Sequence, residues 1–321
     1  MRVLGFGEVM VQLNPTSKGP LRHVNLFEKR VAGSEANVIV GMSRLGFETV
    51  FLTSVGDDEF GKCITSVLSS ERVETKYIKV GKSFTAVYFV QRGFPVPGKT
   101  DVFYYRRGSA FSQFTPDDIA QDIFDGIDLL FISGITPALS ESCYSASKRM
   151  VEVAKERNIK FVFDTNIRKK LLPDKEIAIK TLEFFIQKAD ILLTGMGDLE
   201  HMFPGFELDT QVKYLREFTQ ADIVVVKMGQ EGSRAYERNN LYEVSSFKVE
   251  VVDELGAGDA FDAAFLASFF SGRAINESLL YGNAAGAIVV GAIGDIEPLP
   301  NWKELEMFIS FQKGGEGKLL R

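Results

Sequence analysis

Short apolar runs alternate with segments of helical periodicity along most of the chain. The runs are rich in β-branched and aromatic residues, which is typical of buried strands. They lie at residues 3–7, 49–55, 129–132, 161–163, 191–193 and 223–226. A helix is expected from about Ser34 to Leu45, where Gly46 ends it. The alternation predicts an α/β fold with a mostly parallel sheet covered on both faces.

Two stretches depart from this alternation. Residues 12–31 are rich in loop-forming positions, whereas residues 84–91 and 101–106 have the pattern of paired strands. We expect a single domain spanning residues 1–321, with a small β lid formed by about 12–31 and 84–107 inserted into it. A lid of this kind excludes water from a reaction site. The alternative is an exposed sheet that joins copies of the chain, and the two roles are compatible.

A glycine-rich turn near the C-terminus has the composition of an anion cradle. Apolar and charged residues alternate over residues 247–251, which predicts a strand. Phenylalanines recur at every fourth position from Phe261, which predicts a helix that ends at Gly272. Residues 256–258 form the turn between the two patterns. Because they have no bulky side chains, their backbone can approach a phosphate closely, and the first amides of the helix point at that phosphate. Asp259 follows directly and is a candidate proton acceptor. The alternative is that Asp259 only complements the helix dipole.

Polar residues follow several of the predicted strands. They occupy residues 164–168, 194–198, 227–232 and 253–259. In open α/β sheets, ligands bind beyond the carboxyl ends of the strands, so we expect these segments to share one site. Each segment taken alone is also compatible with ordinary loop chemistry.

Composition narrows the class of protein. The chain has 321 residues, of which 45% are hydrophobic and 25% charged, and its net charge of −6 argues against nucleic-acid binding. No apolar run approaches the roughly 20 residues of a membrane helix, and the N-terminus lacks a signal-peptide pattern, so we expect a cytoplasmic protein that does not bind membranes. Two cysteines and two histidines, without metal-ligand spacing, favour neither a disulfide framework nor a zinc site.

Two motifs resemble those of the ribokinase-like family of carbohydrate kinases, and the resemblance extends over essentially the whole chain. Residues 32–37 are similar to the family's Gly-Gly-x-x-x-Asn signature, with Ala32 in place of the first glycine, and residues 253–259 match its Asp-x-x-Gly-Ala-Gly-Asp signature fully. The resemblance implies a three-layer α/β/α sandwich and an ATP- and Mg²⁺-dependent kinase. It also implies that Asp259 is the catalytic base, with an anion hole formed by Gly256, Ala257 and Gly258.

Within that family, the chain is most similar to kinases of 2-keto-3-deoxygluconate, especially archaeal ones. The similarity lies in residues 32–35, 104–110, 134–137, 164–168 and 294–295. It implies phosphorylation of the 6-hydroxyl of this sugar acid, and possible acceptance of its galactonate epimer. A substrate carboxylate also gives a reason for arginines, because a guanidinium binds carboxylates in bidentate fashion.

The resemblance assigns candidate binding residues. Those for the substrate are Gly33, Ser34, Asn37, Tyr88, Tyr105, Arg106, Arg107, Arg168, Asp259 and Asp295. Those for ATP are Asn166, Arg168, Thr194, Lys227, Gly229, Gly232, Gly256, Ala257 and Gly258. The alternative for Arg106 and Arg107 is a solvated charge pair on an edge strand.

One segment departs from the family pattern. Many members have Asn-x-x-Glu where this chain has Gly195-Met-Gly-Asp198. Asp198 is a candidate to hold Mg²⁺ through water, because Mg²⁺ keeps several waters and few protein ligands.

Other functions remain open from the sequence. The nearest is another kinase of the family, acting on fructose, ribose or a nucleoside. A dinucleotide-dependent oxidoreductase is suggested by Gly5 and Gly7, but Met10 stands where the third fingerprint glycine belongs. A sugar sensor without catalysis is disfavoured by the intact cradle beside Asp259. We also expect a homo-oligomer formed through the β lid.

Overall fold

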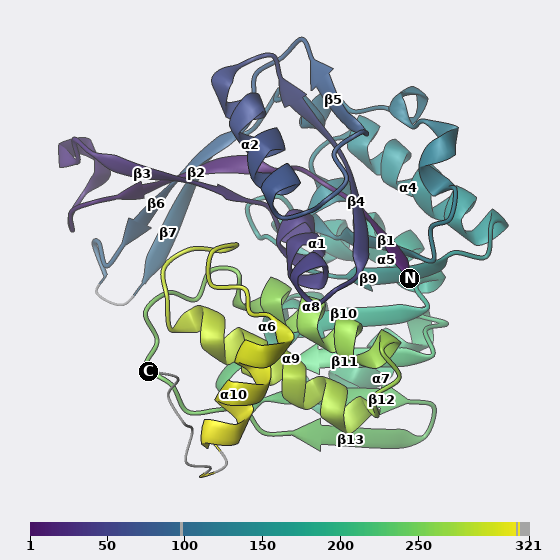
Figure 1. Ribbon diagram of the computed structural model, residues 1–321. Helices are drawn as coiled ribbons and strands as arrows, with labels where there is room; N and C mark the ends of the chain where they lie inside the picture. The colour runs from purple at the N-terminus through teal and green to yellow at the C-terminus, as the bar shows by residue number, and fades with distance from the viewer. Residues whose placement is uncertain (97–98, 313, 315–321) are drawn as a thin grey trace.

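A nine-stranded sheet forms the centre of the molecule (Figure 1). The computed structural model describes residues 1–96, 99–312 and 314. The strand order is β13-β12-β11-β10-β9-β8-β1-β4-β5. Every pairing from β5 to β11 is parallel, and β12 runs antiparallel to both neighbours. The strands are β1 (Arg2–Phe6), β4 (Glu48–Gly56), β5 (Ile78–Gly81), β8 (Leu129–Ser133), β9 (Lys160–Asp164), β10 (Ile191–Gly195), β11 (Ile223–Lys227), β12 (Ser233–Glu237) and β13 (Asn240–Val244).

Helices cover both faces of this sheet, which gives three layers. The helices are α1 (Ser34–Arg44), α2 (Glu59–Ser70), α3 (Ile135–Ala138), α4 (Glu141–Glu156), α5 (Lys175–Lys188), α6 (Met196–Met202), α7 (Leu208–Phe218), α8 (Ala257–Phe270), α9 (Ile275–Val290) and α10 (Trp302–Gln312). Short 3-10 helices lie at Leu21–His23, Phe111–Gln113, Pro116–Asp118, Gln121–Phe124 and Gly229–Glu231.

Successive strand residues pack into different cores. Val3 belongs to the core under α1, α8 and α9, whereas Leu4 belongs to the core under α4 and α5. Strands buried on both faces therefore consist of continuous apolar runs. This arrangement confirms the predicted α/β fold, and all six predicted runs are strands.

A second sheet of four strands projects from this body (Figure 1). Its order is β3-β2-β6-β7, formed by β2 (Met10–Pro15), β3 (Phe27–Ala32), β6 (Val87–Arg92) and β7 (Thr100–Tyr105). The antiparallel pairing of β6 with β7 confirms the strand pair predicted from the sequence. The region 12–31 has more strand than expected, because its loop-forming residues gather at the end of β2 and in the connection to β3. Pro97 and Gly98 of this region lie outside the described residues.

One predicted strand is wrong. Residues 247–251 form no ladder, because β12 and β13 complete the sheet on that side. Their alternation has a different cause, since the ring of Phe247 packs at 5.1 Å on that of Phe308 in α10. The amide of Val252 then donates to the carbonyl of Val290 at the end of α9. The turn before α8 therefore follows extended chain rather than a strand.

None of the helices in the described part of the chain has both the length and the apolar character that crossing a membrane requires.

Candidate active site

The first turn of α1 holds the carboxylate of Asp259. Ser34 Oγ donates to Asp259 Oδ1 at 2.8 Å, and Asn37 Nδ2 donates to Asp259 Oδ2 at 2.7 Å. Gly33 precedes them where the backbone of Glu8 passes closely, so that a Cβ on Gly33 would lie 2.5 Å from the Glu8 carbonyl oxygen. Two donors from one helix therefore fix both oxygens of the acid.

The other side of Asp259 is the glycine turn. Gly256 adopts a left-handed conformation, with φ of 76°, and caps α8, so the amides that open the helix lie beside the acid. Asp259 is buried, and burial raises the pKa of its carboxyl, against the opposing effects of Asn37 and Ser34. A buried carboxylate with a raised pKa next to free helix amides has the properties of a proton acceptor beside an anion site.

The segment after β9 completes this cluster. Asn166 Nδ2 donates to Ser34 Oγ at 2.7 Å, which connects Asn166 to the same network. Arg168 is exposed, and its charge lowers the pKa of Asp259. The structure therefore brings together residues of the segment after β9, of α1 and of α8 that are far apart in the sequence.

Lys227 lies beneath the turn at the end of β11. Its Nζ donates to Asp164 Oδ2 at 3.0 Å and to both oxygens of Asp262 at 2.9 Å. Burial alone would lower the pKa of Lys227, but the two carboxylates raise it above its ordinary value. The pKa of Asp262 is also raised, by burial and by the charge of Asp164. Since a Cβ on Gly258 would lie 3.8 Å from this ammonium, positive charge sits close to the turn.

Asp198 supports the segment after β9 from α6. It accepts hydrogen bonds from Thr165 Oγ1 at 2.6 Å and from the amide of Ile167 at 3.2 Å, and Thr165 also contacts Thr194 Oγ1 at 2.8 Å. Burial and the charge of Asp164 raise the pKa of Asp198. Within the described residues, no group of three or more acidic, histidine or cysteine side chains is placed to bind a metal directly.

A cavity of about 660 Å³ opens beside the turn, a size that accommodates a nucleoside. Five of the candidate ATP-binding residues line this cavity: Lys227, Gly229, Gly232, Ala257 and Gly258. Further walls come from residues 246–249 and Val251, from Gln230, Glu254 and Phe261, and from α9. The apolar alternation that suggested a strand therefore forms a cavity wall.

The lid carries two tyrosines that face each other from neighbouring strands. Tyr88 is buried, and its ring lies 5.5 Å from that of Tyr104 on the same face of the sheet. Tyr88 lies opposite Gln12, which donates to Asp295, so the phenol is on the side of the acids. Burial raises the pKa of Tyr88, and the charges of Asp295 and Asp259 raise it further. We expected Tyr105 beside the substrate site as well, but it lies on the opposite face of the lid. Because successive strand residues face opposite sides, Tyr105 packs on Phe89 on the other face.

Asp295 and the two adjacent arginines differ in their surroundings. Gln12 Nε2 donates to Asp295 Oδ1 at 3.0 Å, and burial together with the charge of Asp259 raises the pKa of Asp295 to about 7. Arg106 is buried, and its Nε donates to Glu8 Oε2 at 2.7 Å. Arg107 is exposed. The structure therefore separates Arg106, which binds Glu8, from Arg107, which faces solvent.

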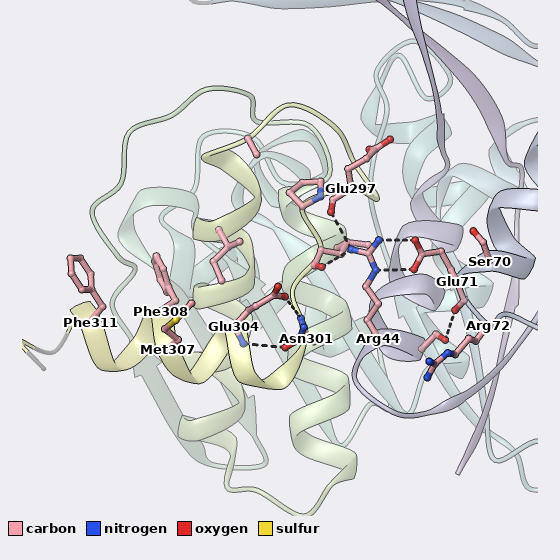
Figure 2. Close-up of a pocket in the computed structure, with 15 residues that line it drawn as sticks. Arg44, Ser70, Glu71, Arg72, Glu297, Asn301, Glu304, Met307, Phe308 and Phe311 are labelled. Carbon is pink, nitrogen blue, oxygen red and sulfur yellow. Dashed lines mark hydrogen bonds and ion pairs between the residues drawn. The ribbon is translucent and has the colours of Figure 1, made fainter. Parts of the chain in front are cut away.

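A larger cavity lies elsewhere, between the ends of α1, α2 and α9 and the helix α10 (Figure 2). It measures about 970 Å³, and Figure 2 shows Arg44 paired with Glu71 on its polar side and Met307, Phe308 and Phe311 on the other. Arg44 also donates to the carbonyl of Leu299 at 2.6 Å. No candidate site residue lines this cavity, so its size does not make it the reaction site.

Several residues of the site were not singled out from the sequence. They are Glu8, which binds Arg106, Gln12, which binds Asp295, Asp262, which binds Lys227, and the lid residues Asn14 and Arg92, which connect Gln12 to Asp253. Glu8 follows β1 at the same sheet edge as the other polar segments, so its position after a strand was an available signal. Gln12, Asn14 and Arg92 had no such signal, because their partners depend on how the lid folds over the body.

A nucleoside-sized cavity, an anion-binding turn and a fixed carboxylate at the carboxyl edge of a parallel sheet define a phosphoryl-transfer enzyme of the α/β class. A family model described as "pfkB family carbohydrate kinase" matches residues 2–302 of this chain. The chain therefore belongs to that family.

Relatives agree with this assignment. The 2-dehydro-3-deoxygluconokinase of Thermoproteus tenax is 38% identical over 95% of this chain and 93% of its own length. The 2-dehydro-3-deoxygalactonokinase of Haloferax volcanii is 32% identical over 91% of each chain. A crystal structure of a putative ribokinase II from E. coli, in complex with ATP and Mg²⁺, has a TM-score of 0.89 and 26% identity, and the match covers 97% of this chain and 99% of that one.

Proposed function

We propose that the protein transfers the γ-phosphoryl group of ATP to the 6-hydroxyl of 2-keto-3-deoxygluconate, and that it also accepts the galactonate epimer. The observation that carries the mechanism is the carboxylate of Asp259, held by Ser34 and Asn37 beside the amides that open α8. The acceptor oxygen forms a bond to the γ-phosphorus while the bond from that phosphorus to the bridging oxygen breaks. ADP leaves, and Asp259 takes the hydroxyl proton.

The cavity beside the turn suits the nucleoside of ATP. Its wall contains Ala257 and Gly258, so a nucleotide in it would direct its phosphates to the amides of the turn. Lys227 adds positive charge below the same turn. These groups stabilise the charge that develops on the transferring phosphoryl group.

Mg²⁺ fits the residues of this edge as an ion bound mostly through water and phosphates. Burial and the charge of neighbouring Asp164 raise the pKa of Asp198, and a cation near the two carboxylates would relieve their repulsion. The ion would neutralise charge on the phosphates of the bound nucleotide.

The carboxylate of the substrate requires a free guanidinium. Arg106 is bound to Glu8, whereas Arg107 and Arg168 are exposed and form no ion pair with the described residues. Arg168 also acts electrostatically on Asp259. We therefore assign the acid group of the substrate to Arg168 or Arg107 rather than to Arg106.

The relatives named for 2-keto-3-deoxy sugar acids support this acceptor. Another kinase of the family, acting on fructose, ribose or a nucleoside, is the alternative. The test is ADP release with 2-keto-3-deoxygluconate, its galactonate epimer, fructose, ribose and adenosine as acceptors. We expect the two acids to give the highest kcat/KM, and a clear preference for a neutral acceptor would contradict the proposal.

The outer face of the lid supports self-association. Phe103 and Tyr105 are exposed there, at 40% and 61%, on the same face as Phe89. Clustered apolar residues on a projecting sheet favour contact with a second sheet. We propose that two copies of the chain associate through this face.

A further inference from the structure

A line of polar side chains crosses the lid and connects two loops of the body. Arg92 donates to Asp253 Oδ2 through Nε at 3.1 Å and also through Nη2, and its Nη1 donates to Asn14 Oδ1 at 2.8 Å. Asn14 Nδ2 donates to Gln12 Oε1 at 2.8 Å, and Gln12 Nε2 donates to Asp295 Oδ1 at 3.0 Å. The middle of the line lies on β2 and β6, and its ends lie on the body.

This line is buried rather than a set of surface contacts. Asp253, Gln12 and Asn14 have 3%, 0% and 2% of their surface exposed. Buried polar groups keep their geometry because every broken bond leaves a desolvated group without a partner. Movement of the lid against the body is therefore opposed at both ends of the line.

Both ends meet the anion-binding turn. Asp253 is the first residue of the signature, and its Oδ1 accepts from the amide of Leu255 at 3.3 Å. At the other end, a Cβ on Gly256 would lie 3.1 Å from the α-carbon of Asp295. Asp253 thus binds the turn on one side, and the backbone of Asp295 lies against Gly256 on the other.

We propose that Arg92 is a positioning residue, which couples the seating of the lid to the placement of the amides at residues 256–258. This inference rests on the proposed phosphoryl transfer. Arg92 donates only to Asp253 and Asn14 among the described residues, and neither of these is a proposed substrate contact. Its effect on the reaction passes through the turn. The seating of the lid on the body therefore sets the position of the amides that form the anion hole.

Loss of Arg92 should loosen the turn at residues 256–258. The variant Arg92→Met leaves the buried carboxylate of Asp253 without its partner, so the turn relaxes. Misplacement by about 1 Å reduces rates on the order of 100-fold in well-organised sites. We expect kcat to fall by about 10- to 100-fold, while KM for ATP and for the acceptor change by less than about threefold. Arg92→Lys, which keeps the charge, should recover part of kcat.

Arg30 is the matched control. It lies on the neighbouring lid strand β3 and also reaches the body, where its Nη1 donates to the carbonyl of Ile293 at 2.6 Å. It does not contact Asp253. Arg30→Met removes a lid contact with the segment before Asp295 but leaves the bonds of Arg92 to Asp253 and of Gln12 to Asp295 in place, so kcat should stay within about threefold.

Amide hydrogen exchange tests the coupling without reference to the reaction. In the full-length, ligand-free protein, Arg92→Met should accelerate exchange in peptides covering residues 254–259, and Arg30→Met should not. Unchanged exchange there would overturn the proposal, and so would faster exchange with kcat unaltered. The kinetic arm uses whichever acceptor the wild-type protein prefers. A neutral acceptor would then contradict the proposed substrate without affecting this test.

Discussion

Lys227 Nζ contacts both carboxylate oxygens of Asp262, each at 2.9 Å. The same ammonium also binds Asp164, so one cation, whose side chain is 17% exposed, neutralises two buried acids. Asp164 Oδ1 finds no hydrogen-bond partner in the described part of the chain. The cluster therefore depends on Lys227 more than on either acid.

Lys227→Met should reduce the free energy of unfolding by about 3–5 kcal/mol, because it leaves two buried carboxylates without their cation. Urea denaturation of the ligand-free protein measures this. Lys148→Met is the control, since Lys148 is 47% exposed and pairs with Glu152 only at 4.0 Å. Its effect should stay below about 1 kcal/mol. Equal effects of the two substitutions would show that the buried cluster adds no stability.

Asp259→Asn should lower kcat by about 100- to 10,000-fold, because an amide cannot accept the hydroxyl proton. ATP affinity, measured by calorimetry, should stay within about threefold, since the nucleotide cavity is unchanged. Asp57→Asn, at an exposed acid beyond the end of β4, controls for loss of one negative charge. Near wild-type turnover of the Asp259 variant would rule out its role as base.

Glu35 gives the protein a pH-dependent stability. Its Oε1 accepts from Ser133 Oγ at 2.8 Å and from Thr136 Oγ1 at 2.6 Å, and burial raises its pKa from 4.5 to about 7. Between these values the folded protein binds one proton more than the unfolded chain. Stability attributable to Glu35 therefore falls as pH rises through this window and is constant above it.

Glu35→Gln removes this titration. The unfolding free energy of the wild type, relative to that of the variant, should fall by about 3 kcal/mol in total between pH 4.5 and 7.5. Urea denaturation at several pH values in this range measures the difference. Glu176→Gln, on the exposed side of α5, is the control and should show no comparable trend. A pH-independent difference between wild type and Glu35→Gln would contradict the assignment.

Gly33→Ala should displace the first turn of α1, because the added Cβ would meet the Glu8 carbonyl oxygen. Since Ser34 and Asn37 move with that turn, kcat/KM should fall on the order of 100-fold. Stability should fall by about 1–3 kcal/mol, as for other overpacked sites. Gly197→Ala is the control for stability, because the Cβ that it adds would have no described atom of another part of the chain within 4 Å.

Tyr105→Glu should weaken self-association, because it places a charge on the exposed outer face of the lid. Sedimentation velocity should show a shift from dimer to monomer at micromolar protein concentration. Val80→Glu, on the edge strand β5, is the control, since Val80 is 66% exposed but lies outside the lid. A variant that sediments like the wild type would exclude the lid as the interface.

The body of the fold was predictable because its strands are buried on both faces and therefore consist of uninterrupted apolar runs. The α8 helix was predictable from the spacing of Phe261, Phe265 and Phe269. The predicted strand at residues 247–251 was wrong because alternation records only that one side of an extended segment is buried. It does not show whether a neighbouring strand is present to pair with it.

The candidate site was predictable only where its residues are close together in the sequence. Residues of one contiguous signature, such as Gly256 and Asp259, stay together in any fold that forms the turn. Tyr104 and Tyr105 could not be distinguished, because the facing side of a strand depends on register. The contact between Arg92 and Asp253 spans 161 positions of the sequence, so no local pattern indicates it.

Opposite sides of Asp259 are built from opposite ends of the chain. Ser34, Asn37 and Tyr88 come from the first third, whereas the nucleotide cavity is lined entirely by residues after Ile223. Selection can thus alter the choice of sugar by changing one end of the gene and leave ATP handling at the other end intact. Chimaeras that exchange residues 1–107 between relatives should therefore change the acceptor preference only as far as Ser34, Asn37, Tyr88 and Arg107 set it, because Arg168 and Asp295 stay with the other parent, and the KM for ATP should not change.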